Sequence, residues 1–496
     1  MLKGLLSFKG SYRTLHLTWF AFFLTFVCWF NFAPFASVIG KELGFDEAQI
    51  KTLLICNLAI TIPARIIIGA LLDRFGPRIT YSILLMFAIV PCIATAVAQD
   101  FNQMVIARLL MGIVGSGFVL GIRMVSEWFP PKDIGMAQGI YGGWGNFGAF
   151  GAEFALPLIA GAAAVFNGGA TNWRFSIILT GVFAAIYGVV YYNSVTDTPP
   201  GKVYQRPKRY GAMEVTSKGD FFGLLIMNFG LVAALGLLAW RLAQKKLHFL
   251  NEGQMYLIWF ILAGLYAYQT YQAWVVNQEM VLGRKQFAPD ERYEFSQVAL
   301  LQMTYITNFG SELAAVSMLP LFFEKTFSLP HAAAGMIAAT YPFLNLFSRP
   351  SGGYISDKFG SRKWTMTIIS GLIGIGYLAA NHIDKTWALP VAVAVTMFSA
   401  LFAQAGCGGT YAIVPLVKKE ITGQIAGNVG AYGNFGGVVY LTIFSLTDAP
   451  TLFATMGMGA LICASLCAFF LKEPRNSFGV DNVAEAQAIP VPSREF

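Results

Sequence analysis

The sequence predicts an all-α membrane protein built from two similar halves of six helices each. Its composition is the first observation: hydrophobic residues make up 56% of the 496 residues and charged residues only 12%, unlike a soluble domain. The second is the recurrence of apolar stretches of about 20 residues, the length that crosses about 30 Å of hydrocarbon. The third is a pair of patterns that occur once in each half. The apolar stretches are too long and continuous for a membrane β-barrel.

Twelve expected membrane-spanning helices form two sets of six. The first set covers 17–39, 51–72, 79–98, 102–126, 135–165 and 175–193, and the second covers 298–322, 332–354, 365–381, 388–412, 423–446 and 451–471. With the N-terminus inside, the Lys-rich and Arg-rich loops all face the cytoplasm. We therefore expect a multi-pass protein of the cell (inner) membrane with both termini cytoplasmic. The same loops explain the net charge of +8 without nucleic-acid binding.

The chain divides into four parts. They are an N-terminal six-helix half (1–195), a central linker (196–295), a C-terminal six-helix half (296–472) and a polar tail (473–496). The linker holds two further apolar stretches, 219–242 and 254–276. They fit an inserted hairpin, which keeps the later helices correctly oriented. Because Arg241 and Lys245 would then lie in an outer loop, the alternative is that both stretches lie along the membrane interface.

Two patterns are duplicated between the halves. The first pattern is an arginine followed by a glycine and a basic loop, and it occupies Arg65 to Arg78 and again Arg349 to Arg362. The offset between the two copies is constant, because 349 − 65 = 284 and 362 − 78 = 284. A glycine-rich phrase around one asparagine occupies 142–148 and 430–436. Glycine costs a helix interior about 1 kcal/mol relative to alanine. The phrase therefore indicates close approach to a small ligand, close helix packing, or both.

These residues resemble a known family. The loop Gly69-x-x-x-Asp73-Arg74-x-Gly76 resembles the major facilitator loop signature, and Arg108-x-x-x-Gly112 resembles a second signature of that superfamily. The doubled [Gly/Ala]-[Trp/Tyr]-Gly-Asn-Phe-Gly phrase, with Gly143 in the first copy and Ala431 in the second, is similar to the nitrate signature of the nitrate/nitrite porter family, over about residues 15–195 and 296–472. The resemblance implies a major facilitator fold with two pseudo-symmetric halves and a substrate site between them.

Arg65 and Arg349 are the central site candidates. An arginine at the middle of a membrane helix costs about 2.5–3.5 kcal/mol on insertion scales, and two such cations facing one cavity favour a bound anion. A planar guanidinium suits a planar oxyanion such as nitrate or nitrite. The resemblance assigns Arg65, Arg349, Asn146 and Asn434 to the binding site, with Gly145 and Gly433 beside the asparagines. It also places Tyr305 and Phe309 as aromatic walls, although both fit simple packing equally well.

Two intramembrane carboxylates, Glu153 and Glu312, are possible partners of the arginines. Counting 1.5 Å per residue, Arg65 and Arg349 lie about 12 Å above the inner ends of their helices, whereas Glu153 lies about 27 Å up and Glu312 about 21 Å. This height difference predicts that the arginines are not neutralised directly. We therefore expect the carboxylates either to carry protons, since burial favours their protonation, or to have a structural role.

The expected function is secondary active transport of nitrate, nitrite or both by alternating access. Uptake of a monovalent anion against a negative potential costs about 2.3 kcal/mol per 100 mV, so nitrate/proton symport is favoured, with nitrate/nitrite antiport as the alternative. A channel, or a transporter of another small anion, is the less favoured interpretation. The expected partners are nitrate, nitrite, protons and the lipid bilayer, and the protein is expected to act as a monomer.

Other site types find no support in the sequence. We expect no enzyme activity, catalytic residue, cofactor or metal, because no such constellation stands in a plausible context. The Gly143-x-Gly145-x-x-Gly148 match to a dinucleotide fingerprint is spurious, since no strand precedes it. The basic loops are expected to steady one conformation through contacts between helices. This predicted gating set is Asp73, Arg74, Arg78, Asp357, Lys358 and Arg362.

Overall fold

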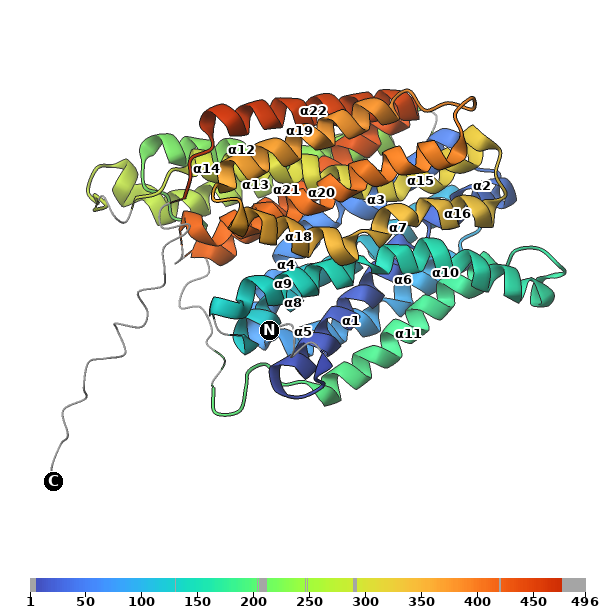
Figure 1. Cartoon of the computed structure of the whole chain (residues 1–496), viewed down its shortest axis with the longest axis horizontal. Helices are drawn as coiled ribbons and strands as arrows, with labels where there is room; N and C mark the ends of the chain where they lie inside the picture. Colours follow the sequence, from blue (N-terminus) through green and yellow to red (C-terminus); the bar gives the residue numbers. More distant parts are fainter. Residues whose placement is uncertain are drawn as a thin grey trace.

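The computed structural model describes residues 6–129, 131–202, 204, 212–245, 247, 249–288, 292–418 and 421–474. Throughout these residues the regular structure is helical, and the two halves lie side by side with their helices roughly parallel (Figure 1). The N-terminal half is coloured from blue to teal, and the C-terminal half from yellow to red. The predicted all-α fold with two six-helix halves is confirmed.

The N-terminal half contains six spans, most of them interrupted by a short break. Its helices are α1 (Gly10–Phe30), η2 (Ala33–Phe35), α2 (Ala36–Leu43), α3 (Glu47–Ala59), α4 (Thr61–Phe75), α5 (Pro77–Phe87), α6 (Ile89–Val97), α7 (Phe101–Val114), α8 (Gly117–Trp128), α9 (Pro131–Asn146), α10 (Gly148–Ala162), η3 (Ala163–Asn167) and α11 (Trp173–Ser194). The break between α9 and α10 falls inside the glycine phrase.

The C-terminal half repeats this plan with different breaks. Its helices are α14 (Phe295–Tyr305), η4 (Ile306–Gly310), α15 (Ser311–Phe327), α16 (His331–Ala338), α17 (Thr340–Phe343), α18 (Asn345–Lys358), α19 (Arg362–Ala380), α20 (Leu389–Val417), α21 (Thr422–Leu446) and α22 (Ala449–Phe470). The segment η4 is a π-helical turn, a feature that recurs at functional sites. Here the second copy of the glycine phrase lies within the continuous helix α21.

Among the described residues, twelve helical segments are long and apolar enough to cross a membrane. They match eleven of the twelve expected spans and add α12 (Lys218–Leu242). The remaining expected span, 332–354, is instead formed by the successive helices α16, α17 and α18. Pro342 and Pro350 stand in this stretch, where each removes a backbone donor and disfavours a straight helix.

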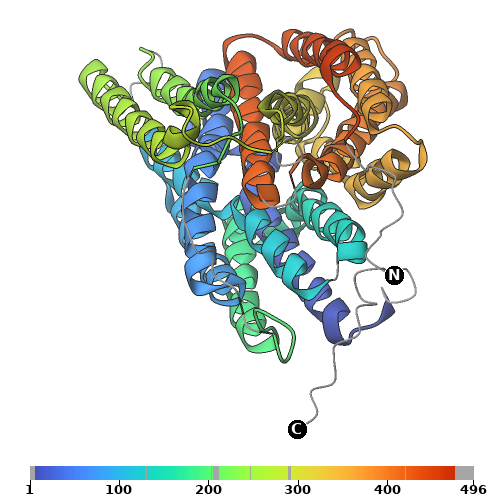
Figure 2. The ribbon, with the colours of Figure 1, turned by 90° about the vertical axis from the view of Figure 1, so that its left-hand side faces the viewer.

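The central apolar stretches form the hairpin α12 and α13 (Glu252–Val281) on the flank of the bundle (Figures 1 and 2). The helix α12 runs the length of α21. The carboxylate of Asp220 accepts from the backbone N–H of Phe295 at 2.8 Å, at one end of the bundle. Near the other end, Arg241 Nη2 donates to the Ser445 carbonyl at 3.2 Å. The length and apolar character of α12 fit a membrane span, and Arg241 near its outer end is paired with this carbonyl. Whether α13 crosses the membrane or lies along its interface stays a prediction.

The two ends of the bundle differ in how the halves meet. We call the end with the α4–α5 and α18–α19 loops the inner end, and the other the outer end. Lys325 pairs with Glu47 at 2.8 Å, and Lys51 Nζ donates to the Thr447 carbonyl at 2.7 Å. Both contacts join the halves at the outer end, so the structure is closed there.

Candidate functional site

Arg65 lies between the halves near the middle of the bundle. It belongs to α4 and is only 6% exposed. Its Nη1 donates to the Gly430 carbonyl of α21 at 3.0 Å. The Asn434 amide, oriented by its hydrogen-bonding partners, accepts from Arg65 Nη1 at 2.7 Å and from Nε at 3.3 Å. The arginine of the N-terminal half is thus held by the glycine phrase of the C-terminal half.

One donor of Arg65 remains without a partner. Its Nη2 is buried and forms no hydrogen bond within the part of the chain that the structure describes. A buried guanidinium N–H that lacks an acceptor costs free energy, and a charged donor fork binds oxyanions well. The arrangement around Arg65 therefore leaves a donor free to hydrogen-bond to an anion.

Arg349 has different partners. It belongs to α18, is 5% exposed, and its Nη2 forms an ion pair with Glu312 Oε2 at 2.9 Å. Its Nε donates to Asn345 Oδ1 at 2.9 Å, while Asn345 Nδ2 donates to Glu312 Oε1 at 2.6 Å. These three side chains form a closed network, all contributed by the C-terminal half.

The expectation that Glu312 sits too high to reach an arginine is therefore wrong. A rise of 1.5 Å per residue gives heights only along straight, regular α-helices. In the structure, the π-helical turn η4 directly precedes the helix of Glu312, and α18 begins after two breaks in its span. For Arg65 the prediction that no carboxylate pairs directly with the arginine holds, because the described residues provide no carboxylate partner.

Glu153 has no such contact. It lies in α10, is fully buried, and neither carboxylate oxygen has a hydrogen-bond partner among the described residues. Its backbone carbonyl lies at the packing surface with α16 of the other half, where a Cβ on Gly335 would come within 2.9 Å. The two candidate carboxylates therefore have different contacts: Glu312 pairs with a site arginine, and Glu153 does not.

Aromatic rings enclose both arginines. Tyr305 and Phe309 stack with their centroids 5.1 Å apart, and the guanidinium carbons of Arg65 and Arg349 lie 5.9 Å and 5.1 Å from the Phe309 centroid. The two cations are thus no farther apart than the sum of these distances. A cation placed above the face of an aromatic ring is attracted to it. Phe309 contacts both arginines, and Tyr305 stacks on Phe309, so both aromatics predicted from the sequence lie at the site.

Three further side chains at this place were not predicted. Tyr411 meets the Tyr305 ring edge-on at 5.2 Å, and Phe118 lies 5.6 Å from the Arg65 guanidinium. Asn345 bridges Glu312 and Arg349, as described above. The position of Asn345, one helical turn before Arg349, was a usable signal. Nothing in their sequence surroundings distinguishes Phe118 or Tyr411 from packing aromatics.

The glycines of the two phrases divide into packing positions and site positions. A Cβ on Gly145 would collide with the Phe22 ring, and one on Gly433 would come within 2.6 Å of Phe309 and 2.8 Å of Tyr305. Both glycines therefore make room for aromatic side chains, and their place in the binding site stays a prediction. Gly142 and Gly430 do face the arginines, each opposite the arginine of the other half, with 3.9 Å and 3.7 Å from a built Cβ to the guanidinium.

Asn146 differs from Asn434. Its Nδ2 donates to the Gly142 carbonyl of its own helix at 2.6 Å, and its Oδ1 has no partner among the described residues. It is 1% exposed. In this structure Asn146 therefore contacts neither arginine, and its binding role stays a prediction.

The predicted gating residues are only partly described. Arg78 Nε donates to the Tyr192 carbonyl at 2.7 Å, and Arg362 Nη1 donates to the Ala412 carbonyl at 3.2 Å. Arg74 lies over the Phe75 ring at 5.2 Å. The contacts of Arg78 and Arg362 connect helices within one half each, whereas the Arg74 contact lies within α4. The side chains of Asp73, Asp357 and Lys358 lie outside the described residues.

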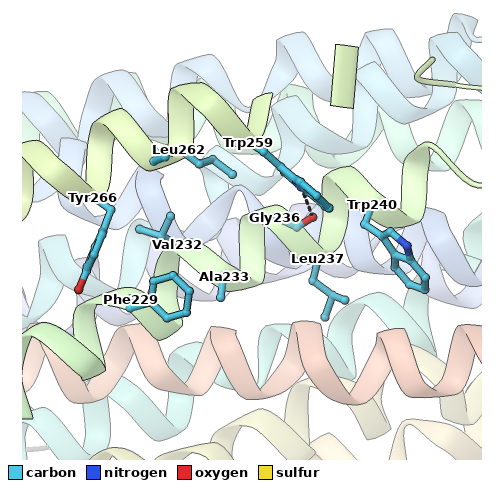
Figure 3. A pocket seen from close by; sticks show the side chains of 10 residues that line it. Phe229, Val232, Ala233, Gly236, Leu237, Trp240, Trp259, Leu262 and Tyr266 are labelled. Atoms are coloured by element: carbon cyan, nitrogen blue, oxygen red, sulfur yellow. Dashed lines mark hydrogen bonds between the residues drawn. The ribbon is translucent and has the colours of Figure 1, made fainter. Parts of the chain in front are cut away.

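An apolar groove lies away from the arginines. It has a volume of about 570 Å³ and is walled by apolar side chains of α12 and α13, including Phe229, Trp240 and Trp259 (Figure 3). Within it, Trp259 Nε1 donates to the Gly236 carbonyl at 3.1 Å. A site for a small anion is favoured by cationic donors, and no charged residue is among the described residues that line this groove, so the arginine cluster is the candidate functional site.

Comparison with known proteins agrees with this geometry. The family model described as Major Facilitator Superfamily matches residues 18–285 and 301–494. The chain is 72% identical to the "Nitrate/nitrite transporter NrtP" of Nostoc punctiforme, over 100% of this chain and 99% of the relative. This chain belongs to the nitrate/nitrite porter family of the Major Facilitator Superfamily. It is a membrane transport protein and not an enzyme.

Further matches support the same assignment. The NrtP of a Picosynechococcus species is 53% identical over 100% of this chain and 99% of the relative. Among solved structures, a peptide-bound transporter of the POT family has a TM-score of 0.65 at 14% identity, covering 92% of this chain and 96% of that one. The structural match shows the fold alone, whereas the sequence matches show the family.

Proposed function

We propose that this protein carries nitrate and nitrite across the cell membrane by alternating access, and that it couples nitrate to protons as a symporter. The relatives named as nitrate/nitrite transporters support the substrate. The chemistry of the site supports it independently, because two buried guanidiniums provide planar donors that match a small planar oxyanion. The aromatic rings around them exclude water, which strengthens an ionic contact.

The ion pair between Arg349 and Glu312 supports proton coupling. A carboxylate and a nitrate ion are both anions that accept from a guanidinium, so they compete for Arg349. Protonation of Glu312 removes its charge, weakens its hold on the arginine and leaves a cation without a counter-ion. The proton and the anion then favour each other's binding, which is the thermodynamic requirement for symport.

This coupling also meets the electrical cost of uptake. One nitrate that enters with one proton moves no net charge, and each additional proton would draw on the membrane potential, about 2.3 kcal/mol per 100 mV. Glu153 is the second candidate proton carrier. Because it contacts neither arginine, it does not compete with the anion, and we assign the coupling to Glu312.

Proteoliposomes with nitrate and nitrite on defined sides test this proposal. We expect an inward proton gradient to drive nitrate accumulation in the wild type, with tighter nitrate binding at lower pH. Glu312→Gln should still bind and exchange nitrate but lose both the accumulation and the pH dependence, whereas the matched Glu153→Gln should retain both. Uptake that ignores the proton gradient and requires internal nitrite would establish antiport instead.

Counterflow distinguishes a transporter from a channel. Alternating access predicts that internal nitrate accelerates uptake of labelled nitrate, because the loaded site returns faster than the empty one. The outer closure by the Lys325–Glu47 and Lys51–Thr447 contacts supports such a cycle. Channel-like currents without this acceleration would contradict the proposal.

We also propose that the protein acts as a monomer with both termini in the cytoplasm. The basic residues at the inner end support this orientation through the positive-inside tendency. A reporter fused to the C-terminus that is active only in the cytoplasm should give a signal. A signal only from a periplasm-dependent reporter would reverse the topology.

A further inference from the structure

The helix that bears the second glycine phrase has two functional sides. Gly430 and Asn434 lie one turn apart on α21 and both contact Arg65. Tyr432 lies two residues from each, so it projects from the opposite side of the helix. There its hydroxyl donates to the Met227 carbonyl of the inserted helix α12. The site-bearing part of α21 is thus contacted from behind by the hairpin.

A glycine makes this contact possible. A Cβ on Gly230 would come within 2.7 Å of Tyr432 Oη and 3.5 Å of its ring carbon Cζ. Gly230 lies one turn after Met227, so both residues of α12 that meet Tyr432 are on one face. The close approach of α12 to α21 therefore depends on the absence of a side chain at this position.

The first helix of the hairpin, α12, is hydrogen-bonded to the C-terminal half at three places along its length. Besides the contact at Tyr432, the Asp220–Phe295 hydrogen bond holds the inner end of α12, and the Arg241–Ser445 bond holds the outer end. These three contacts at three heights hold α12 against the C-terminal half.

The first phrase has its own support from behind. Trp144 occupies the position that corresponds to Tyr432, and its ring meets Trp19 edge-on at 5.3 Å and stacks near His16 at 6.3 Å. Both partners belong to α1 of the same half. The aromatic residue of each phrase therefore anchors its helix on the side away from Arg65 and Arg349, but the C-terminal half uses the inserted hairpin for this purpose.

We propose that the inserted hairpin positions the anion-binding side of α21, through the contact of Tyr432 with Met227 and Gly230. The inference rests on the proposed binding site, since it assumes that Gly430 and Asn434 orient Arg65 for nitrate. Tyr432 is on this account a positioning residue that never touches the anion.

The chain offers a matched control for this contact. Tyr266 of α13 donates its hydroxyl to the Leu225 carbonyl of α12 at 3.1 Å, two residues from the carbonyl that Tyr432 uses. Removal of either hydroxyl thus deletes a tyrosine–carbonyl hydrogen bond on the same helix, but only Tyr432 connects to the site helix. Gly264 of α13, where a Cβ would meet nothing within 4 Å, is the control for Gly230.

The experiment compares the KM and the maximal rate of nitrate uptake, with the melting temperature, for Tyr432→Phe, Tyr266→Phe, Gly230→Ala and Gly264→Ala. Since single hydrogen bonds between membrane helices contribute modestly, we expect Tyr432→Phe and Gly230→Ala to raise KM about three- to tenfold, with the maximal rate nearly unchanged. The two control variants should leave KM unchanged, even where they lower the melting temperature.

Two outcomes separate failure of this inference from failure of the proposed site. If Arg65→Lys destroys nitrate binding while Tyr432→Phe and Gly230→Ala change only the melting temperature, the site stands and the positioning role is wrong. If Arg65→Lys binds nitrate normally, the site itself is misplaced and the inference fails with it. Equal rises in KM for Tyr432→Phe and Tyr266→Phe would also overturn it, because they would indicate general loosening of the hairpin.

Discussion

The two half-sites are built from the same sequence patterns but are held in different ways. Arg65 reaches across to the other half, where Gly430 and Asn434 accept its hydrogen bonds. Arg349 stays within its own half, paired with Glu312 and Asn345, while Asn146 turns back to its own helix. One arginine is therefore supported by neutral acceptors, and the other by a carboxylate.

The neighbouring residues explain this difference. At the constant offset of 284 residues, Asn345 corresponds to Thr61 because 345 − 284 = 61. The Thr61 hydroxyl donates to the Gly112 carbonyl at 2.6 Å, so it joins α4 to α7 and does not approach Arg65. The two copies of the arginine thus have different neighbours at the position one turn before them, and among the described residues only Arg349 of the two has a carboxylate partner.

The largest expected effect is replacement of either arginine by lysine. Arg65→Lys and Arg349→Lys should each abolish high-affinity transport, with nitrate affinity lowered at least about a hundredfold. An ammonium cannot reproduce the planar donor fork, and hydrogen bonds to charged groups are each worth about 1.5–3 kcal/mol. Nitrate binding to purified protein, with insertion and folding checked by gel filtration, measures the effect.

Arg123→Lys is the matched control for these variants. Arg123 pairs with Glu127 at 2.9 Å, four residues away, and is partly exposed, so its replacement should change little. Retained affinity in Arg65→Lys or Arg349→Lys would show that the arginine concerned is structural.

The next largest effect concerns the two carboxylates. Glu312→Ala leaves Arg349 buried without its counter-ion, so stability should fall by about 3–5 kcal/mol, and nitrate should restore part of the loss by taking the place of the carboxylate. Glu153→Leu removes a buried carboxyl that has no partner among the described residues, so stability should be unchanged or slightly higher. Thermal unfolding with and without nitrate compares the two, and a Glu312→Ala protein that nitrate does not stabilise would contradict this account.

Much of the fold and part of the site were predictable from the sequence. Helix length and loop charge gave the spans, and the repeated patterns identified Arg65, Arg349 and Asn434, which the structure brings together with Tyr305 and Phe309. The partnership of Glu312 and Arg349 was missed because rise per residue describes straight helices only, and a π-helical turn immediately precedes Glu312. Tyr411 and Phe118 were missed because contacts between distant spans leave no local pattern.

Replacing the asparagines should lower nitrate affinity less than replacing the arginines, and the losses at Asn434 and Asn146 should differ clearly. Asn434→Leu removes the acceptor that orients Arg65, and the loss of a hydrogen bond to a charged group should weaken nitrate binding about ten- to a hundredfold. Asn146→Leu removes a bond to the Gly142 carbonyl of its own helix, and we expect a loss of only a few-fold. Calorimetric titration with nitrate measures both, and equal losses would mean that Asn146 contributes to the anion as strongly as Asn434.

The smallest expected difference lies at the first glycine of each phrase. A methyl group at Gly142 would be in ordinary contact with Phe118 and Arg349, at 3.8 Å and 3.9 Å, whereas one at Gly430 would reach 3.0 Å from Tyr411 Oη. Gly142→Ala should therefore raise the melting temperature, because alanine favours a helix by about 1 kcal/mol, and change nitrate affinity less than about threefold. Gly430→Ala has to displace the Tyr411 hydroxyl beside Arg65 and should weaken binding several-fold. If Gly142→Ala instead stabilised the protein but weakened nitrate binding as much as Gly430→Ala, both phrases would need room for the anion itself, and the half-sites would be alike when occupied.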